Sequence, residues 1–462
     1  MRQKAISEAV SRHPWRDLLH LAWPMLIAQV AVVLNGVIDT VMAGRLSRLD
    51  LAAIGVGSAI YISVFVAIIG VLLALPPMIA HLHGAGQQDD IGEEVRQMAW
   101  LTLGLMVVVL VLLKNPQPLL VLAHLQPAVE TKVIAYLDAL AWGIPAQLAF
   151  RVLYGFCSGI GKPRPIMVLN LIGLALKIPL NLVFMTGDFG IPAMGAAGCG
   201  IASSLIAWII CLIGWNWCRN EPEYAAYAIF SRWSAPHPSR LVALLRLGLP
   251  IGATFLVDVT AFTFMALFIA RLGPTASGAH QIAASLTALL YMLPLAIGQA
   301  AGILAGQALG RGDPDTARHI GLTGLAMGLG CAVCVSLLLS FGNHAIAALY
   351  SHDHEVQQLA AHLLAIVAIY HLADGLQAVV VNLLRGYKKA LLPMLIYAVF
   401  LWGFGLAGGV MLGLSDVLGP PRGAAGFWIA AVGGLAIAGM LVTAYWWRIA
   451  THQRTVPAAI TP

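Results

Sequence analysis

The sequence predicts an all-α membrane protein with twelve transmembrane helices, arranged as two six-helix bundles related by a pseudo-two-fold axis along the membrane normal. Three observations predict this fold class. Of the 462 residues, 60% are hydrophobic and only 10% are charged, against about 25% in an average soluble domain. Apolar runs long enough to cross a bilayer recur along the whole chain. The second half of the chain repeats motifs of the first half.

The composition excludes several function classes. Charged residues are too few to cover the exterior of a soluble protein, which excludes a cytosolic enzyme, a nucleic-acid binder and a secreted disulfide scaffold. The six cysteines lie in or beside apolar segments, and the pair Cys331-x-x-Cys334 sits inside the run GLGCAVCVSLLL. We interpret that pair as packing rather than as a metal site, and we expect no cofactor.

Twelve apolar runs are long enough for a crossing, which needs about 20 residues. They cover residues 18–43, 51–80, 97–113, 134–157, 164–186, 194–218, 241–271, 276–308, 317–340, 356–384, 391–413 and 423–447. Each is expected to be a helix, because an open strand edge cannot satisfy its backbone in lipid.

The basic residues predict the orientation. Of 26 lysines and arginines, 17 fall on the side of the N-terminus, six fall on the other side and three lie within spans. Because positive charge accumulates on the cytoplasmic side, both termini are expected in the cytoplasm.

An internal repeat divides the spans into two sets of six. Five pairs of matching segments are separated by a nearly constant offset of 226 to 228 residues. They are Pro24 and Pro250, Arg45-Leu46 and Arg271-Leu272, Gly84-x-Gly86-x-x-Asp89 and Gly310-x-Gly312-x-x-Asp315, Gly159-x-x-Lys162 and Gly386-x-x-Lys389, and Gly195-Ala-Ala-Gly198 and Gly423-Ala-Ala-Gly426. Small residues are common in membrane helices, which explains any one match but poorly explains the ordered series.

Six spans per repeat is an even number, so the two halves have the same orientation in the membrane. We expect an N-terminal lobe over residues 1–218, a polar cytoplasmic linker over 219–240 and a C-terminal lobe over 241–462. Two facing lobes would enclose a central cavity, and rocking one lobe against the other would expose that cavity to each side in turn.

Four ionisable residues lie inside predicted spans, where each costs about 2.5–3.5 kcal/mol on insertion scales and is therefore a functional candidate. They are Asp39, Lys177, Asp258 and Asp374. At the repeat offsets Asp258 corresponds to Val32, Asp39 to Met265 and Asp374 to Gln147. The other repeat thus has no acid at these positions, so the shared fold does not require them. The alternative role is hydrogen bonding between helices.

Polar residues near these positions recur at helical spacing, which predicts inward-facing, water-accessible helix faces. The stripes are His371, Asp374 and Gln377 in the tenth span, Gln281 and Ser285 in the eighth, and Asn170, Lys177 and Asn181 in the fifth. A carboxylate on such a face can hold a proton or Na⁺ and can also attract a cationic molecule. Competition between ion and cargo for one carboxylate is a sufficient mechanism for antiport.

Seven segments together resemble one transporter family. They are LAWPMLIAQVAVVLNGVIDTVMAG, LAAIGVGSA, KIPLN, GIPAMGAAGCGIA, LLYMLP, LRGYKK and AAGFW. Over essentially its whole length the chain is similar to the multidrug and toxic compound extrusion (MATE) family, in its NorM-like branch. The resemblance implies twelve helices in two lobes, a V-shaped cavity, and export of amphipathic, often cationic compounds in exchange for Na⁺ or H⁺.

The resemblance also implies roles for single residues. Asp39 matches the acid of the family's first helix, and Asp374 matches the acid of the tenth. Asp258 matches a position where NorM-like relatives carry Glu, which shortens the side chain at an expected Na⁺ site. Tyr291, Gln281 and Ser58 match positions near ion or drug.

Lys177 is a departure from the family, since the matching position is usually Asn, one turn before Asn181. We hypothesise that Lys177 pairs with Asp39 in place of a cation. Coupling would then depend mainly on Asp258 and Asp374.

Other functions stay open at this stage. A lipid-linked oligosaccharide or lipid flippase has related lobes, but three acids and one lysine favour cationic cargo. The sequence contains no HExxH or GxSxG motif that would support an intramembrane enzyme, and it shows no filter-like signature of a channel. We therefore expect a non-enzymatic, monomeric transporter of a bacterial inner membrane, which binds small amphipathic molecules and no nucleic acid.

Overall fold

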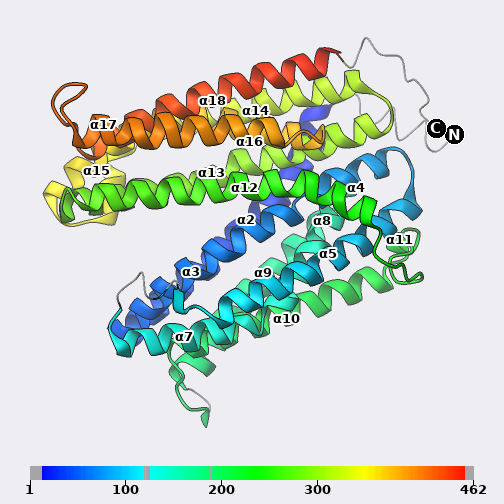
Figure 1. Cartoon of the computed structure of the whole chain (residues 1–462), viewed down its shortest axis with the longest axis horizontal. Coiled ribbons are helices and arrows are strands. Elements are labelled where there is room, and N and C mark those ends of the chain that lie inside the picture. Colours follow the sequence, from blue (N-terminus) through cyan, green and yellow to red (C-terminus); the bar gives the residue numbers. More distant parts are fainter. Residues whose placement is uncertain (1–12, 119, 121–124, 188–189, 453–462) are drawn as a thin grey trace. The chain divides into compact units, whose positions relative to one another are not determined.

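The computed structural model describes residues 13–118, 120, 125–187 and 190–452. Those residues form helices and connecting turns, with no β-strand among them (Figure 1). The predicted all-α fold class is confirmed. The helices of the first half are α2 (Pro14–Leu46), α3 (Arg48–Leu72), α4 (Leu75–Gly84), α5 (Gln88–Lys114), α7 (Pro127–Ala141), α8 (Ile144–Gly159), α9 (Arg164–Asn181), the π-helix η1 (Leu182–Thr186), α10 (Ala196–Asn220) and the short α11 (Pro222–Ala225).

The second half repeats this arrangement with longer continuous helices. Its elements are α12 (Pro238–Ala270), α13 (Pro274–Gly310), α14 (Pro314–Tyr350), α15 (His354–Gly386), α16 (Leu391–Ala398), the π-helix η3 (Val399–Ala407), α17 (Gly408–Leu414) and α18 (Ala424–His452).

The crossings agree with the predicted spans. In the described part of the chain, eleven helices or continuous helix pairs are long and apolar enough to cross a membrane. The fourth predicted span is divided into α7 and α8, which meet at a bend of 49°, and counting that pair as one span gives twelve. The break falls at Trp142 and Gly143, just before Pro145. Proline has no N–H to donate to the preceding turn, which explains a break at this place.

The backbone carries the repeat that the sequence indicates. Gly86 and Gly312 both have a positive φ, of 73° and 76°, where the second span of each half turns into the third. Gly195 and Gly423 also correspond, with φ of 56° and 59°, directly before α10 and α18. An L side chain rarely adopts this left-handed conformation, so glycine is needed at each of these four turns.

The fifth crossing of each half shows a further correspondence. It begins as an α-helix and continues as a π-helix, η1 after α9 and η3 after α16. π-Helical turns are rare and often occur at functional positions. In both halves the π-helical segment follows the polar residues that are discussed below.

The residue contacts divide the chain into two compact units. One unit is Pro24–Gly252, and the other joins Ala253–Pro462 with the residues before Pro24. Both boundaries fall inside a helix, next to the repeat-related prolines Pro24 of α2 and Pro250 of α12.

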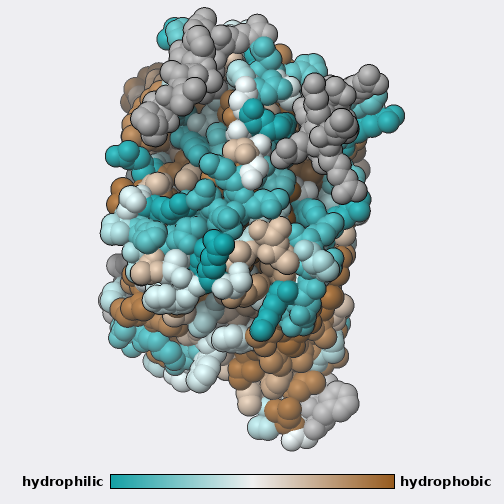
Figure 2. Space-filling model, turned by 90° about the vertical axis from the view of Figure 1, so that its right-hand side faces the viewer, coloured by the Kyte–Doolittle hydropathy of each residue, from teal (hydrophilic) through white to brown (hydrophobic). Residues whose placement is uncertain are grey.

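In the unit Pro24–Gly252, α10 packs against α7, α8 and α9, and α3 packs against α7. Figure 2 shows a face on which many hydrophilic residues gather. It is the right-hand side of Figure 1, where α11 and the turn from α4 to α5 of this unit lie.

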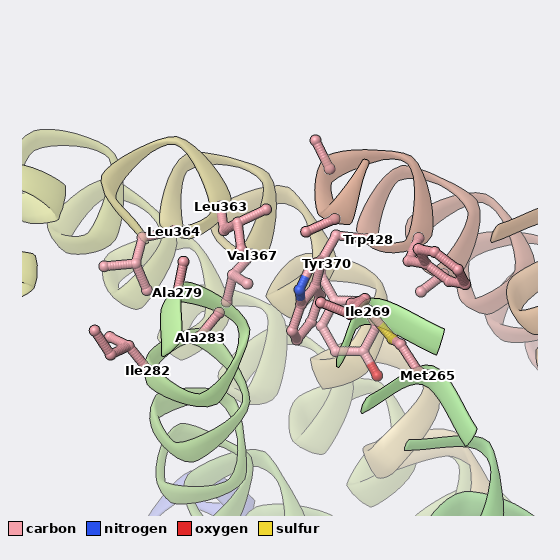
Figure 3. Packing of buried hydrophobic residues seen from close by; sticks show 14 of the residues in the cluster. Met265, Ile269, Ala279, Ile282, Ala283, Leu363, Leu364, Val367, Tyr370 and Trp428 are labelled. Atoms are coloured by element: carbon pink, nitrogen blue, oxygen red, sulfur yellow. The ribbon is translucent and has the colours of Figure 1, made fainter. Parts of the chain in front are cut away.

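The other unit is organised around α15, which packs against α13, α14 and α18. Its core is a cluster of buried apolar side chains in which Trp428 and Tyr370 meet edge to face, with ring centroids 5.6 Å apart (Figure 3). Ile269, Ala279 and Val367 are fully buried in the same cluster. This packing fixes the rotation of α15 about its axis, and it therefore determines which residues of that helix face the pocket described below.

The segment that joins the repeats is held against α5. Arg96 Nη1 donates to the carbonyl of Ala228 at 2.8 Å, and Arg96 Nε donates to Ser234 Oγ at 3.1 Å. Trp100 Nε1 donates to the Ser234 carbonyl at 3.0 Å. Arg240 pairs with two acids of the first turns of α5, Asp90 at 2.8 Å and Glu94 at 3.2 Å. The connector, residues 219–240, is therefore held in place by α5, and it is called the strap below.

Candidate functional site

The first group of polar side chains gathers around Asp39 of α2, in the unit Pro24–Gly252. Lys177 Nζ lies 2.9 Å from Asp39 Oδ1, and Asn181 Nδ2 donates to the same oxygen at 2.8 Å. Lys177 and Asn181 are one turn apart on α9, so they reach Asp39 from the same helix face. Lys177 Nζ also donates to Ser203 Oγ of α10 at 2.5 Å.

This group is closed to the surroundings. The exposed fraction is 8% for Asp39, 2% for Lys177 and 0% for Asn181. Opposite charges neutralise one another at the centre of the group, which satisfies the requirement for a buried charge. The pairing that the sequence suggested is therefore present, and the ammonium of Lys177 occupies one side of the only carboxylate in this group.

The second group surrounds a small pocket in the unit Ala253–Pro462. It encloses about 20 Å³, enough for one water molecule and far too little for a drug-sized molecule. Its lining residues are Thr254, Phe255, Asp258, Tyr291, Gln377, Ala378, Val381, Asn382, Arg385 and Tyr397. Three of the predicted site residues, Asp258, Tyr291 and Gln377, thus meet in one place from α12, α13 and α15.

Asp258 is held by one hydroxyl. Tyr397 of α16 donates to Asp258 Oδ1 at 2.6 Å, a short distance typical of a bond to a charged oxygen. Unlike Asp39, Asp258 has no Lys or Arg ion pair among the described residues. Its negative charge is therefore available to a small cation or a proton.

Asp374 lies on α15 one turn before Gln377 and does not line the pocket. It is 6% exposed, and its Oδ2 has no hydrogen-bond partner among the described residues. His371 Nδ1 lies 3.9 Å away, which is too far for a hydrogen bond. Asp374 and Asp258 lie near enough for their charges to interact, so a negative charge on either carboxylate disfavours a negative charge on the other.

Ser58 and Gln281, also predicted from the resemblance, are not among the residues that line the pocket. Ser58 donates to the Gly55 carbonyl of its own helix at 3.1 Å. Gln281 is exposed, and its Nε2 lies 3.4 Å from Ser285 Oγ, one turn further along α13. Neither lines the pocket around Asp258, so their roles near ion or cargo stay predictions.

Sequence reasoning missed Arg385, Asn382 and Tyr397. Arg385 extends the tenth-span stripe, because Asp374, Gln377, Val381 and Arg385 advance by three or four residues along one helix face. Asn382 lies one turn before Arg385. The predicted span ended at residue 384, one position before Arg385. Tyr397 carried no signal, since a single tyrosine in an apolar helix is ordinary.

The donor set suits a lightly bound cation more than a resident metal. In the part of the chain that the structure describes, no group of three or more His, Cys, Asp and Glu side chains could hold a metal ion. Around Asp258 the further oxygens are neutral, from Tyr397, Tyr291, Gln377 and Thr254. One carboxylate and neutral oxygens beside the Arg385 guanidinium are a poor donor set for a resident divalent metal.

Comparisons with known proteins agree with the architecture. The MatE family model matches the chain twice, over residues 24–183 and 250–411, which are the two halves of the repeat. The "Probable multidrug resistance protein NorM" of Aromatoleum aromaticum is 40% identical over 92% of both chains. The "Multidrug resistance protein MdtK" of Edwardsiella ictaluri is 36% identical, over 92% of this chain and 94% of that protein.

Solved structures share the fold. A "MATE in the bent conformation" aligns with a TM-score of 0.88 over 97% of this chain and 98% of that one, at 18% identity. An "Outward-facing conformation of a multidrug resistance MATE family transporter of the MOP superfamily" gives 0.87 over 96% and 97%, also at 18% identity. With a family model that matches both halves and relatives near 40% identity over nearly the whole chain, this multi-pass membrane protein belongs to the MatE family.

Proposed function

We propose that the chain is a secondary active multidrug exporter. It moves amphipathic, often cationic compounds out of the cytoplasm in exchange for Na⁺ or H⁺. Family membership supports this proposal, as do the relatives named as multidrug resistance proteins. No bond is made or broken in the cargo, so the protein is a transporter and not an enzyme.

The observation that carries the coupling proposal is the state of the acids in the unit Ala253–Pro462. Asp258 faces a water-sized pocket, and Asp374 is buried nearby with an oxygen that lacks a hydrogen-bond partner among the described residues. A buried carboxylate and a half-buried one close to it cannot both stay charged at low cost, so at least one of them gains free energy by taking a proton or a cation. The same groups release that ion when water reaches them from the other side.

The acid in the other unit has a different role in this proposal. Asp39 already holds the ammonium of Lys177 at 2.9 Å, so an external cation would have to displace a tethered one. A tethered ion has a high effective concentration at its site, which disfavours exchange. Coupling therefore depends mainly on Asp258 and Asp374, with Na⁺ or H⁺ as the exchanging ion.

The two lobes supply the conformational change that transport needs. In this proposal residues 1–218 and 241–462 are two six-helix lobes joined by 219–240, and alternating access exposes the cargo site to each side in turn. The pocket at Asp258 admits an ion and not a cargo molecule, so ion and cargo occupy different volumes. The protein lies in a bacterial inner membrane with both termini in the cytoplasm, acts as a monomer and has no cofactor.

The flippase alternative is less favoured. The relatives are named for multidrug resistance, and Asp258 and Asp374 attract cationic cargo more than the anionic phosphates of lipid-linked sugars.

Transport by purified protein in proteoliposomes tests the proposal. A cationic dye such as rhodamine 123 is loaded, and an inward Na⁺ gradient and an inward proton gradient are imposed separately. We expect one of the gradients to drive saturable dye export, with export lost when the gradient is collapsed. Dye movement that ignores both gradients would refute coupling, and an ohmic, unsaturated current would indicate a channel.

A further inference from the structure

Arg318, near the start of α14, is a cation that the proposed function does not use. Its guanidinium carbon lies 4.4 Å from the centroid of the Trp447 ring of α18. Among the described residues no carboxylate lies within ion-pair distance of Arg318, and its Nε is buried without a hydrogen-bond partner. A guanidinium carries five N–H donors, so this one retains donors for a ligand.

A glycine brings Arg318 and Trp447 together. Gly321 lies one turn after Arg318 on α14, and a Cβ at this position would lie 2.4 Å from Cζ2 of Trp446. Because glycine has no Cβ, the Trp446 ring can lie against α14, where it is 0% exposed. The next residue of α18, Trp447, is 43% exposed and covers the guanidinium from outside.

The helix faces that carry this pair are apolar and exposed further along. Leu322 and Leu329 share the face of Arg318 on α14, and they are 40% and 44% exposed. Met440 shares the face of Trp447 on α18 and is 58% exposed. Exposed apolar side chains on a membrane-spanning helix contact acyl chains. Tryptophan and arginine at the end of such faces are typical of the level at which lipid headgroups lie.

This end of the helices carries an excess of positive charge. Further basic residues lie before α14, after α15 and at the end of α18, and all are exposed: Arg311, Lys388, Lys389 and Arg448. Tyr387, directly before the two lysines, lies near enough to Arg318 to interact with its charge. The acids of the same turns are Asp313 and Asp315, and Asp313 Oδ1 caps α14 by accepting from the Thr316 N–H at 3.0 Å.

We propose that Arg318 and Trp447 bind the headgroup of an anionic phospholipid, whose acyl chains lie along the exposed apolar faces of α14 and α18. Guanidinium binds phosphate with paired hydrogen bonds, and basic sites between transmembrane helices suit anionic headgroups. A headgroup with net negative charge is also attracted by the four exposed basic residues at this end. The inference does not depend on which ion or cargo the protein transports.

Lipid binding to the purified full chain tests the proposal. Protein stripped of lipid in detergent is titrated with dioleoyl phosphatidylglycerol or dioleoyl phosphatidylcholine, which differ in headgroup but not in acyl chains. Native mass spectrometry gives the dissociation constant of the first bound lipid. Arg318→Gln is compared with Arg16→Gln, because Arg16 also stacks on a tryptophan, Trp15, at 5.1 Å in the same compact unit but is fully accessible to water or lipid.

We expect the native protein to bind phosphatidylglycerol about tenfold more tightly than phosphatidylcholine, and Arg318→Gln to lose most of that preference. Arg16→Gln should stay within about twofold of the native protein for both lipids, since an exposed charge contributes little. Arg318→Lys keeps the charge but loses the fork, so its affinity for phosphatidylglycerol should fall between those of the native protein and the Gln variant.

Three outcomes would overturn the site. They are equal native affinities for the two lipids, an unchanged lipid preference in Arg318→Gln, and equal losses in Arg318→Gln and Arg16→Gln. If Arg318→Gln gives too little folded protein to titrate, Arg318→Lys decides. A selective loss of phosphatidylglycerol affinity in that variant supports the site, and native affinities for both lipids overturn it.

Inorganic phosphate distinguishes a lipid headgroup from a free anion. Millimolar phosphate should leave the phosphatidylglycerol affinity of the native protein unchanged, because a free ion lacks the acyl chains that hold the lipid against α14 and α18. If phosphate displaces the lipid from the native protein but not from Arg318→Gln, the occupant is a free anion and the lipid assignment is wrong.

Discussion

Lys177 Nζ and Asp39 Oδ1 lie 2.9 Å apart between α9 and α2, with both side chains almost fully buried. Removing the ammonium leaves a buried carboxylate, a change that costs about 3–5 kcal/mol when nothing replaces the lost partner. In Lys177→Asn we expect Na⁺ or a proton to fill that place. The melting temperature of this variant should therefore gain a dependence on Na⁺ or pH, measured by thermal unfolding in detergent.

Two further variants identify the origin of that dependence. Adding Asp39→Asn to Lys177→Asn should remove it, because the amide has no charge to balance. Lys114→Asn breaks another lysine–aspartate pair of the same unit, with Asp138 at 2.8 Å, in which both side chains are about half exposed, and it should leave ion dependence as in the native protein. If the melting temperature of Lys177→Asn depends on Na⁺ and pH only as it does in the native protein, then Asp39 binds no ion even after Lys177 has been removed.

The acids of the other unit should be required for coupling. We expect Asp258→Asn and Asp374→Asn each to reduce gradient-driven export at least tenfold while leaving expression intact, since a neutral amide cannot exchange a cation. Export in proteoliposomes and membrane yield are the two measurements. Asp416→Asn, at an exposed loop position, is the matched control and should export normally. Native export by both the Asp258 and the Asp374 variant would remove the coupling proposal.

The strap between the repeats should lose its order when Arg96 is replaced. Arg96→Gln removes the bond to the Ala228 carbonyl, so we expect faster amide hydrogen exchange across residues 226–238. Arg232→Gln is the control, because its pair with Asp89 is 3.6 Å long and well exposed, and such pairs contribute little. Equal exchange in the two variants would mean that the strap is held by other contacts.

Two repeat-related glycines, Gly198 and Gly426, allow close helix contacts, and replacing either one by alanine should destabilise the protein. A Cβ at Gly198 would lie 2.1 Å from the carbonyl oxygen of Phe184, and one at Gly426 would lie 2.7 Å from the carbonyl carbon of Leu412. Alanine at either position should destabilise the protein by about 1–3 kcal/mol through overpacking, seen as a lower melting temperature. Gly433→Ala, which meets nothing within 4 Å, should be neutral or slightly stabilising. A normal melting temperature for Gly198→Ala would show that η1 and α10 can move apart enough to admit the methyl group.

The fold followed from the sequence because its determinants are local. Apolar length defines each crossing, and the glycines at 86, 195, 312 and 423 mark turns whose backbone conformation few other residues adopt. The bend at Trp142 and Gly143 was not predicted, since hydropathy is continuous across it and only the following proline indicates a break.

Only part of the candidate site could be predicted from the sequence. Asp39, Asp258 and Asp374 were identified because charge in an apolar span is costly and therefore conspicuous. Arg385 escaped notice because a basic residue at the end of a span fits the ordinary charge bias of cytoplasmic loops. Whether it points into the protein or out to water depends on how α15 is rotated, and that rotation is determined by packing around Trp428 and Tyr370.

The strap also bears on how such a chain can arise from a duplicated gene. Its anchoring bonds run from Ala228, Ser234 and Arg240 back to α5, inside the polypeptide that has already been made. Every partner in these bonds therefore lies before or within the first turn of α12, so the joint needs no residue from the rest of the second repeat. A chain made by fusing two copies would therefore carry the contacts that hold its connector within the first copy.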